Sequence, residues 1–205
     1  IQWKPESTGT GRFGNWLENL VDWNLSRSRY WGTPLPIWRT EDGSEEICIG
    51  SLAQLKEEIE KAQASGTLTD VQAKGNAAFL KALAAGEADL HRPFVDEVFL
   101  LSGTGNVLMR ELDLIDVWFD SGAMPFAQWH YPFENQDIFK QSYPADFISE
   151  GVDQTRGWFF TLHAISSMVE DSVAFKNVVS TGLVLDKNGN KMSKRLGNAI
   201  DPFET

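Results

Sequence analysis

Three short apolar runs, each followed by a glycine, organise the second half of this chain. They are residues 114–119, 146–149 and 177–180, and the glycines are Gly122, Gly151 and Gly182. The spacing is about 30 residues, the length of a strand–helix–strand unit. Helical patterns fill the intervals, around 123–131, 138–142 and 153–169. We therefore expect two such units in series, giving an α/β fold with three parallel strands and helices on the sheet faces.

Polar side chains follow the apolar runs. Asp120 and Ser121 follow the first, Glu150, Gly151, Asp153 and Gln154 follow the second, and Thr181 follows the third. In open α/β sheets, ligands bind beyond the carboxyl ends of the strands. The pattern is typical of a ligand site, and ordinary punctuation between strand and helix is an equally acceptable interpretation of the residues alone.

The first half has a different organisation. Apolar periodicity predicts a helix over 15–26, and alternation predicts a hairpin over 37–49 that turns near Asp42 and Gly43. Two helices should follow, one opened by a capping box at Ser51 and Gln54, the other over 70–85. Their buried positions are expected to be Leu52, Leu55, Ile59 and Ala62, then Val71, Phe79, Leu80 and Leu83. Residues 41–92 are predicted to form a small helical insert with an acidic exterior.

Charge and composition exclude several function classes. The net charge of −11 argues against nucleic-acid binding over most of the surface, although residues 1–40 and 176–205 are each basic. The single cysteine excludes an internal disulfide framework and a cysteine-cluster metal site. No apolar run is long enough for a membrane span. The chain begins with isoleucine rather than methionine, we expect no secretory leader, and a helix is expected to begin at 201–205, so we expect a piece of a longer protein.

A basic loop follows the third run. Lys191, Lys194 and Arg195 lie within five residues, between Gly189 and Gly197. Lysines on a mobile loop suit a clamp that stabilises growing charge on a polyphosphate. A solvated basic segment is the alternative.

Four motifs together resemble class I aminoacyl-tRNA synthetases of the isoleucyl type. K-M-S-K-R at 191–195 is similar to the K-M-S-K-S signature of the class. D-V-W-F-D-S-G at 116–122 and E-G-V-D-Q-T-R-G-W at 150–158 resemble the isoleucyl branch. Residues 15–38 resemble the segment where that family's chain leaves its editing insertion.

The resemblance implies a fold, parts and site residues. The fold is the second half of a Rossmann-like nucleotide-binding fold plus a small α+β insert. The implied parts are a junction segment over 1–40, a connective insert over 41–92 and the catalytic half over 93–205. Trp118 and Trp158 would form the isoleucine side-chain pocket, whereas Glu150, Gly151, Asp153 and Gln154 would contact the aminoacyl-adenylate. Lys191 and Lys194 would be catalytic, and these two with Ser193 and Arg195 would bind ATP.

The implied reaction has two steps: ATP-dependent formation of isoleucyl-adenylate, then transfer to tRNA(Ile). ATP with Mg²⁺ would be used, with no metal site in this chain. The resemblance further implies a cytoplasmic monomer with no membrane partner. The fifth loop residue is Arg195 rather than serine, and no H-I-G-H-type motif occurs, so we expect the chain alone to be inactive. A valyl- or leucyl-type enzyme, a non-catalytic tRNA-contacting module and protein binding by 41–92 remain alternatives.

Overall fold

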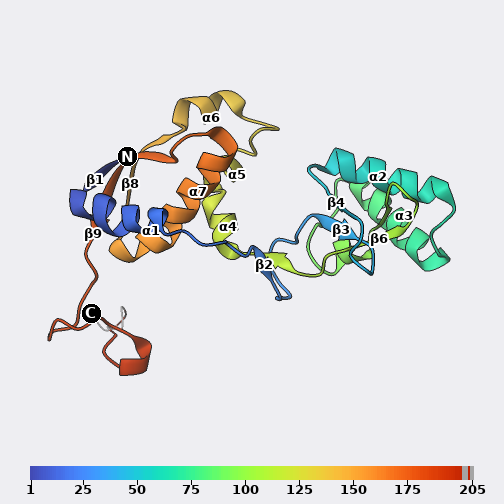
Figure 1. Cartoon of the computed structure of the whole chain (residues 1–205). Coiled ribbons are helices and arrows are strands. Elements are labelled where there is room, and N and C mark those ends of the chain that lie inside the picture. Colours follow the sequence, from blue (N-terminus) through green and yellow to red (C-terminus); the bar gives the residue numbers. More distant parts are fainter. Residues whose placement is uncertain (200–202, 204–205) are drawn as a thin grey trace. The chain divides into compact units, whose positions relative to one another are not determined.

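The computed structural model describes residues 1–199 and 203, apart from the side chain of Lys194 (Figure 1). The helix expected to begin at 201–205 lies outside the described residues. The chain divides into two compact units. Unit 1 combines Ile1–Trp23 with Trp118–Thr205, and unit 2 is Asn24–Val117. Unit 2 is thus inserted, in sequence, between the two parts of unit 1.

Unit 1 is built on a three-stranded parallel sheet. Its strands are β1 (Gln2–Lys4), β9 (Phe175–Thr181) and β8 (Ala145–Gly151), in that order across the sheet. The predicted α/β class and the strands over 146–149 and 177–180 are confirmed. The central strand, β9, pairs with the first strand of the chain on one side and with β8 on the other.

The prediction of one parallel strand over 114–119 is wrong. Leu114 and Ile115 form the short strand β7, which pairs antiparallel with β2 (Ser26–Arg27) in unit 2. Helix α4 then begins and runs over Val117–Gly122. A short apolar run fits a buried strand or one face of a helix equally well, so periodicity alone could not separate them. The third parallel strand is instead β1.

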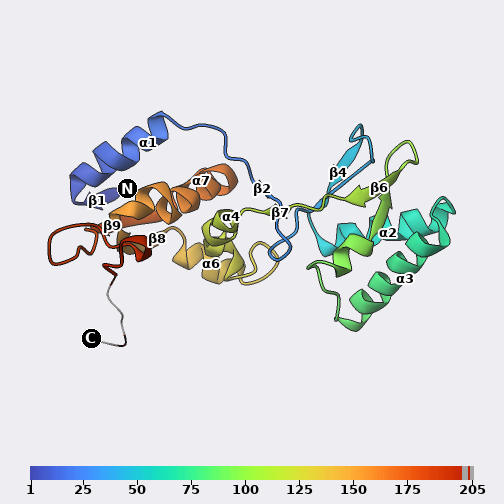
Figure 2. The ribbon, with the colours of Figure 1, turned by 90° about the horizontal axis from the view of Figure 1, so that it is seen from below.

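Helices cover one face of the unit 1 sheet. The π-helix η1 (Thr8–Phe13) continues into α1 (Gly14–Glu18), which lies beside α7 (Trp158–Glu170) in Figure 2. The helix expected over 15–26 therefore begins earlier and ends earlier. Buried aromatic and aliphatic side chains from these helices meet the sheet in one core: Phe13, Phe159, Leu162, Ala174, Phe175 and Val178.

Shorter helices complete unit 1. They are α5 (Met124–Ala127), α6 (Gln136–Ser142) and the 3-10 helices η3 (Val152–Arg156) and η4 (Lys194–Leu196). The helical patterns around 123–131 and 138–142 are thus present, the first only in part. The helix expected over 153–169 consists of two elements, η3 and α7. The other sheet face is open, because Phe147 is 58% exposed and Val179 is 39% exposed.

Unit 2 is a four-stranded antiparallel sheet with two helices. The strands are β4 (Glu46–Cys48), β3 (Ile37–Arg39), β6 (Val107–Arg110) and β5 (Phe99–Leu101), in that order. Helices α2 (Leu52–Ser65) and α3 (Asp70–Ala85) pack on one side of it (Figure 2), with the 3-10 helix η2 (Phe94–Glu97) after them. The predicted hairpin over 37–49 and both predicted helices are confirmed.

Local sequence explains the helix starts in unit 2. The Ser51 hydroxyl accepts a bond from the Gln54 amide, and Thr69 forms a full capping box with Gln72. At Ser51 the box is incomplete, because Gln54 Oε1 accepts from Gly50 instead. Of the expected inward positions, Leu52 is 46% exposed and Val71 is 72% exposed, because both lie in the first helical turn, outside the core. The others are buried or half-buried: Leu55, Ile59, Ala62, Phe79, Leu80 and Leu83.

The expected insert, 41–92, lies inside unit 2, and the compact unit extends beyond it on both sides. Strand β3 precedes that range, and β5 and β6 follow it. The helices alone cannot bury their apolar stripes, so the sheet that they cover belongs to the same core. Trp38 from β3 shows this, because its indole nitrogen donates to the Val98 carbonyl at 2.9 Å within that core.

Candidate functional site

The polar segment after β8 lies at the carboxyl edge of the parallel sheet. Glu150 pairs with Ser180 and Gly151 with Thr181, at the last positions of both strands. The chain then enters η3, which carries Asp153 and Gln154. The Glu150 side chain is exposed at this edge. The location expected from the strand ends is therefore the observed one for these residues.

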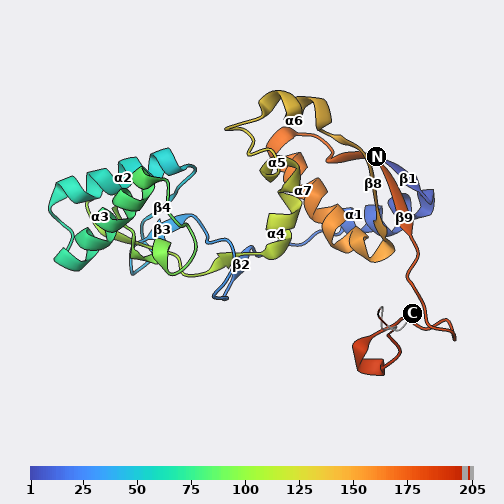
Figure 3. The ribbon, with the colours of Figure 1, turned by 180° about the vertical axis from the view of Figure 1, so that it is seen from behind.

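Helix α4 reaches the same edge by packing against α7 (Figure 3). Gly122 is buried, and a methyl carbon at that position would lie 2.8 Å from Ile165 Cδ1 and 2.9 Å from the Thr161 backbone. Only a glycine permits so close an approach. The contact is fixed by the Trp158 indole nitrogen, which donates to the Ser121 carbonyl at 3.0 Å. Trp118, although not on a strand, thereby lies over Gly157, which precedes Trp158 in the chain.

Gln154 joins the polar and the aromatic parts of the site. Its Oε1 accepts a bond from the Trp158 amide at 3.0 Å, and its Nε2 donates to Asp153 Oδ2 at 3.0 Å. The amides in the first turn of a helix have no partner within the helix. Gln154 supplies a partner for the Trp158 amide at the start of α7, and this bond holds the Gln154 carboxamide in place.

Glycines lie beneath these polar groups. A methyl carbon on Gly151 would lie 2.5 Å from Asp153 Oδ1. One on Gly157 would lie 2.9 Å from Gln154 Oε1 and 3.4 Å from Trp118 Cη2. The carboxylate, the carboxamide and one indole ring therefore approach the bare backbone of 151–157.

We call Trp118, Asp153, Gln154, Gly157 and Trp158 the tryptophan cluster. Trp118 is 43% exposed, whereas Trp158 is half-buried against the unit 1 core. Indole rings supply flat apolar surface, and the carboxylate and carboxamide supply polar groups beside it. The arrangement suits a small molecule with an aliphatic part and a charged or polar part.

The basic loop is shaped by Asp186 and Asn198. Asp186 Oδ1 accepts from the amides of Asn188 and Asn190, and its Oδ2 accepts from Asn198 Nδ2 at 2.9 Å. Asn198 Oδ1 in turn accepts from the Ser193 amide at 2.9 Å. These bonds, first among them the one from Asn198, lower the pKa of Asp186. They join the residues on either side of the K-M-S-K-R segment.

The predicted ATP-binding residues all lie on this loop. Lys191 and Arg195 are exposed, and Ser193 is half-buried. The backbone of Lys194 begins η4, and its side chain lies outside the described part of the structure. The bonds given above connect residues of the loop with one another. The approach of Lys191 and Lys194 to the tryptophan cluster stays a prediction.

Sequence reasoning missed two contributors. Gly157 gave no signal beyond its place in the motif, since its importance comes from two side chains that lie over it. The other is Arg12, whose Nε donates to Thr155 Oγ1 at 2.9 Å. Thr155 is fully buried and also donates to the Val152 carbonyl, so η3 is tied to η1. A bond over so long a sequence separation leaves no local pattern to recognise.

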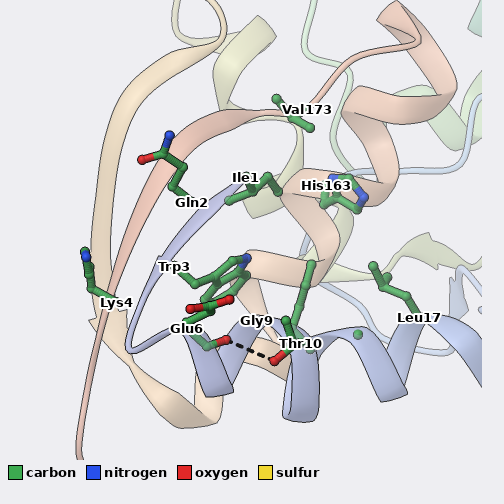
Figure 4. Close-up of a pocket in the computed structure, with 12 residues that line it drawn as sticks. Ile1, Gln2, Trp3, Lys4, Glu6, Gly9, Thr10, Leu17, His163 and Val173 are labelled. Atoms are coloured by element: carbon green, nitrogen blue, oxygen red, sulfur yellow. Dashed lines mark hydrogen bonds between the residues drawn. The ribbon is translucent and has the colours of Figure 1, made fainter.

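A separate pocket of about 650 Å³ lies between β1, η1, α1 and α7 (Figure 4). His163 points into it from α7, and its Nδ1 is buried without a hydrogen-bond partner among the described atoms. Burial lowers the pKa of His163. None of the residues predicted to bind substrate lines this pocket.

Two further findings concern the described residues alone. They contain no group of three or more His, Cys, Asp or Glu side chains that could hold a metal ion. No helix among them has the length and apolar character needed to cross a membrane.

Comparisons with known proteins agree with the motifs. Isoleucine–tRNA ligases of Cytophaga hutchinsonii, Porphyromonas gingivalis and Thermus thermophilus are 70%, 67% and 49% identical to this chain over its whole length. The chain spans 17–18% of the length of these relatives.

A solved structure has a similar fold. It is a LeuRS of Agrobacterium radiobacter K84 in a ternary complex with tRNA and LeuAMS, with a TM-score of 0.55 and 18% identity over 94% of this chain and 24% of that one. The family model for tRNA synthetases class I (I, L, M and V) matches residues 1–205. The chain therefore belongs to the class I tRNA synthetases of this group.

Proposed function

We propose that this chain is part of the catalytic region of an isoleucine–tRNA ligase. The complete enzyme would activate isoleucine with ATP to isoleucyl-adenylate and transfer the isoleucyl group to tRNA(Ile). The names of the relatives and their identity over the whole chain support the isoleucine branch over the valine and leucine branches.

The observation that carries the proposal is the tryptophan cluster. At the carboxyl edge of a parallel sheet, Gln154 bonds to Asp153 and to the amide of Trp158 in α7, and the Trp118 ring of α4 lies over the adjacent Gly157. We assign the aliphatic side chain of isoleucine to Trp118 and Trp158, because indole faces make a dry slot for a branched chain. Asp153, Gln154, Glu150 and Gly151 are assigned to the α-ammonium group and the ribose of the adenylate.

The chemistry then follows from positioning. In the first step, the isoleucine carboxylate attacks the α-phosphate of ATP, and pyrophosphate leaves with the electron pair of the broken bond. In the second step, a terminal ribose hydroxyl of tRNA attacks the carbonyl carbon, and AMP leaves. Neither step requires a covalent enzyme nucleophile, so this chain's residues act by orienting the reactants and stabilising charge.

Lys191 and Lys194 are assigned to the phosphates. A lysine ammonium is a flexible point charge, and the departing pyrophosphate gains negative charge in the transition state. Arg195 keeps the loop cationic, and Ser193 offers a hydroxyl. The clasp between Asp186 and Asn198 gives this loop a defined shape. ATP would be used with Mg²⁺.

The remaining assignments follow the same proposal. Residues 1–40 would lead from the editing insertion into the catalytic body, 41–92 would form a connective insert, and 93–205 would complete the catalytic domain. Isoleucine, ATP and tRNA(Ile) would be the partners of the full-length enzyme, which we propose to be a cytoplasmic monomer.

Substitutions in the full-length ligase test this proposal. Trp118→Ala and Trp158→Ala should each raise the KM for isoleucine by about tenfold or more, with the KM for ATP nearly unchanged. Lys191→Ala should instead weaken ATP use and leave the isoleucine KM nearly unchanged. The assay is isoleucine-dependent ATP–pyrophosphate exchange. Equal losses for both substrates in all three variants would contradict the assigned pocket, and tRNA binding without adenylate formation would favour a non-catalytic module.

A further inference from the structure

Gly157 has no side chain, and the space beside its α-carbon is taken by two neighbouring side chains. The position that a methyl carbon would occupy has Gln154 Oε1 at 2.9 Å and Trp118 Cη2 and Cζ3 at 3.4 and 3.5 Å. Both neighbours belong to the tryptophan cluster. The ring distances are ordinary van der Waals contacts, whereas the oxygen is too close for any carbon to be tolerated without movement.

Gln154 has little freedom to move aside. Its Oε1 holds the Trp158 amide, and its Nε2 holds Asp153 Oδ2. The other oxygen of Asp153 lies over Gly151, where no side chain is present. A methyl group at 157 therefore forces the carboxamide away from the Trp158 amide, and the bond to Asp153 must be rebuilt or lost as well.

We propose that Gly157 is a positioning residue for substrate binding: its bare backbone lets Gln154 hold the geometry in which the amino acid's ammonium group is bound. The inference rests on the proposed function of the site, since it assigns Gln154 to the amino acid. Gly157 touches no reactant and acts through Gln154. The contact to Trp118 plays no part in the effect, because at 3.4–3.5 Å that ring can remain where it is.

The test is a double-mutant cycle in the full-length ligase. Gly157→Ala alone should raise the KM for isoleucine by about tenfold, while the KM for ATP and the thermal midpoint stay nearly constant. In a Gln154→Ala background the same substitution should change the isoleucine KM by less than about twofold, because the group through which it acts is gone. Equal effects in both backgrounds would overturn the inference.

Gly11→Ala is the matched control, because a methyl carbon at that position has no atom within 4 Å. It should leave both KM values unchanged. A rise in the isoleucine KM for Gly11→Ala as large as that for Gly157→Ala would overturn the specific role of position 157.

Hydrogen exchange supplies a readout that does not depend on activity. Loss of the Gln154 bond should speed exchange in peptides covering 152–160, in Gly157→Ala and in Gln154→Ala alike. If Gln154→Ala leaves that exchange unchanged, the inference fails whatever the fate of the glycine variant. If Gln154→Ala speeds exchange but leaves the isoleucine KM unchanged, the assignment of Gln154 in the proposed function fails, and with it the inference that rests on it. If Gln154→Ala raises the KM and Gly157→Ala does not, only the present inference fails.

Discussion

His163 has a buried ring nitrogen that finds no partner among the described atoms. Burial disfavours the charged imidazolium, so the pKa of His163 in the folded chain lies below the ordinary value of 6.5. Its contribution to stability is complete above pH 6.5 and is lost as the pH falls through that value toward the folded pKa. Protonation of His163, which lines the pocket in Figure 4, thus destabilises the folded chain.

This gives a prediction for pH dependence. The thermal midpoint of the chain should fall between about pH 7.5 and about pH 5.5, and His163→Gln should flatten the curve in that window. Differential scanning fluorimetry measures it. His130→Gln is the control, since the His130 side chain is 66% exposed. If His163→Gln and the control have curves as steep as the parent's, His163 is not the group responsible.

At the residue scale, the motif residues could be predicted from the sequence, but the tertiary contacts that hold them in place could not. Trp118, Gln154 and Trp158 were expected near one another; Gln154 accepts a bond from the Trp158 amide, and the Trp118 ring lies over Gly157, which stands between Gln154 and Trp158 in the sequence. That Trp158 donates to Ser121 could not be foreseen, since it depends on how α4 packs against α7. Tertiary contacts of this kind have no period in sequence.

Helix α3 is joined to strand β5 by one side chain. Asn76 is fully buried, its Nδ2 donates to the Phe99 carbonyl at 2.7 Å, and its Oδ1 accepts from the Phe99 amide at 2.8 Å. The side chain therefore replaces a strand partner on the edge of the unit 2 sheet. Buried polar groups that lose such partners are costly.

We expect Asn76→Ala to destabilise unit 2 by about 1–3 kcal/mol for each backbone group left unpaired. Denaturant unfolding measures this. Lys74→Ala, at an exposed position on the same helix, should change stability by less than about 0.5 kcal/mol. A cost for Asn76→Ala as small as that would contradict the bridging role.

Elements were predictable where their length and caps were clear. Helix α3 begins and ends where its pattern indicated, because Thr69 and Gly86 cap it. The run over 114–119 was misjudged, since a strand of two residues and a helix of six share it. Strand β1 is only three residues long and was missed for the same reason: so short a segment has too few positions to display alternation.

The two units have separate cores. The core of unit 2 includes Leu100, which is fully buried, and the core of unit 1 includes Leu162, which is 4% exposed. Among the described residues, these two core clusters share no member. A core substitution in one unit should therefore destabilise that unit and leave the stability of the other unchanged.

Leu100→Ala should cost unit 2 about 2–5 kcal/mol. Hydrogen exchange followed by mass spectrometry should show faster exchange in 24–117 and unchanged exchange in the unit 1 helices. Leu162→Ala is the matched variant and should give the opposite pattern. Loss of protection in both units from either change would mean that they unfold as one.

The isolated chain should not catalyse the first step. It spans 17–18% of the length of its relatives and carries no H-I-G-H-type motif. Isoleucine-dependent exchange of pyrophosphate into ATP should stay at background for the purified chain. Activity above that level would show that these residues are sufficient for activation.

The strand order has a consequence for synthesis. Strand β1 pairs with β9, so residues 2–4 lack their strand partner until residues 177–179 have left the ribosome. Unit 2 is continuous in sequence and can fold while the rest is still being translated. Residues 2–4 thus reach their final partners late, and a nascent-chain crosslink between Trp3 and Val178 would appear only after residues 177–179 have emerged from the ribosome.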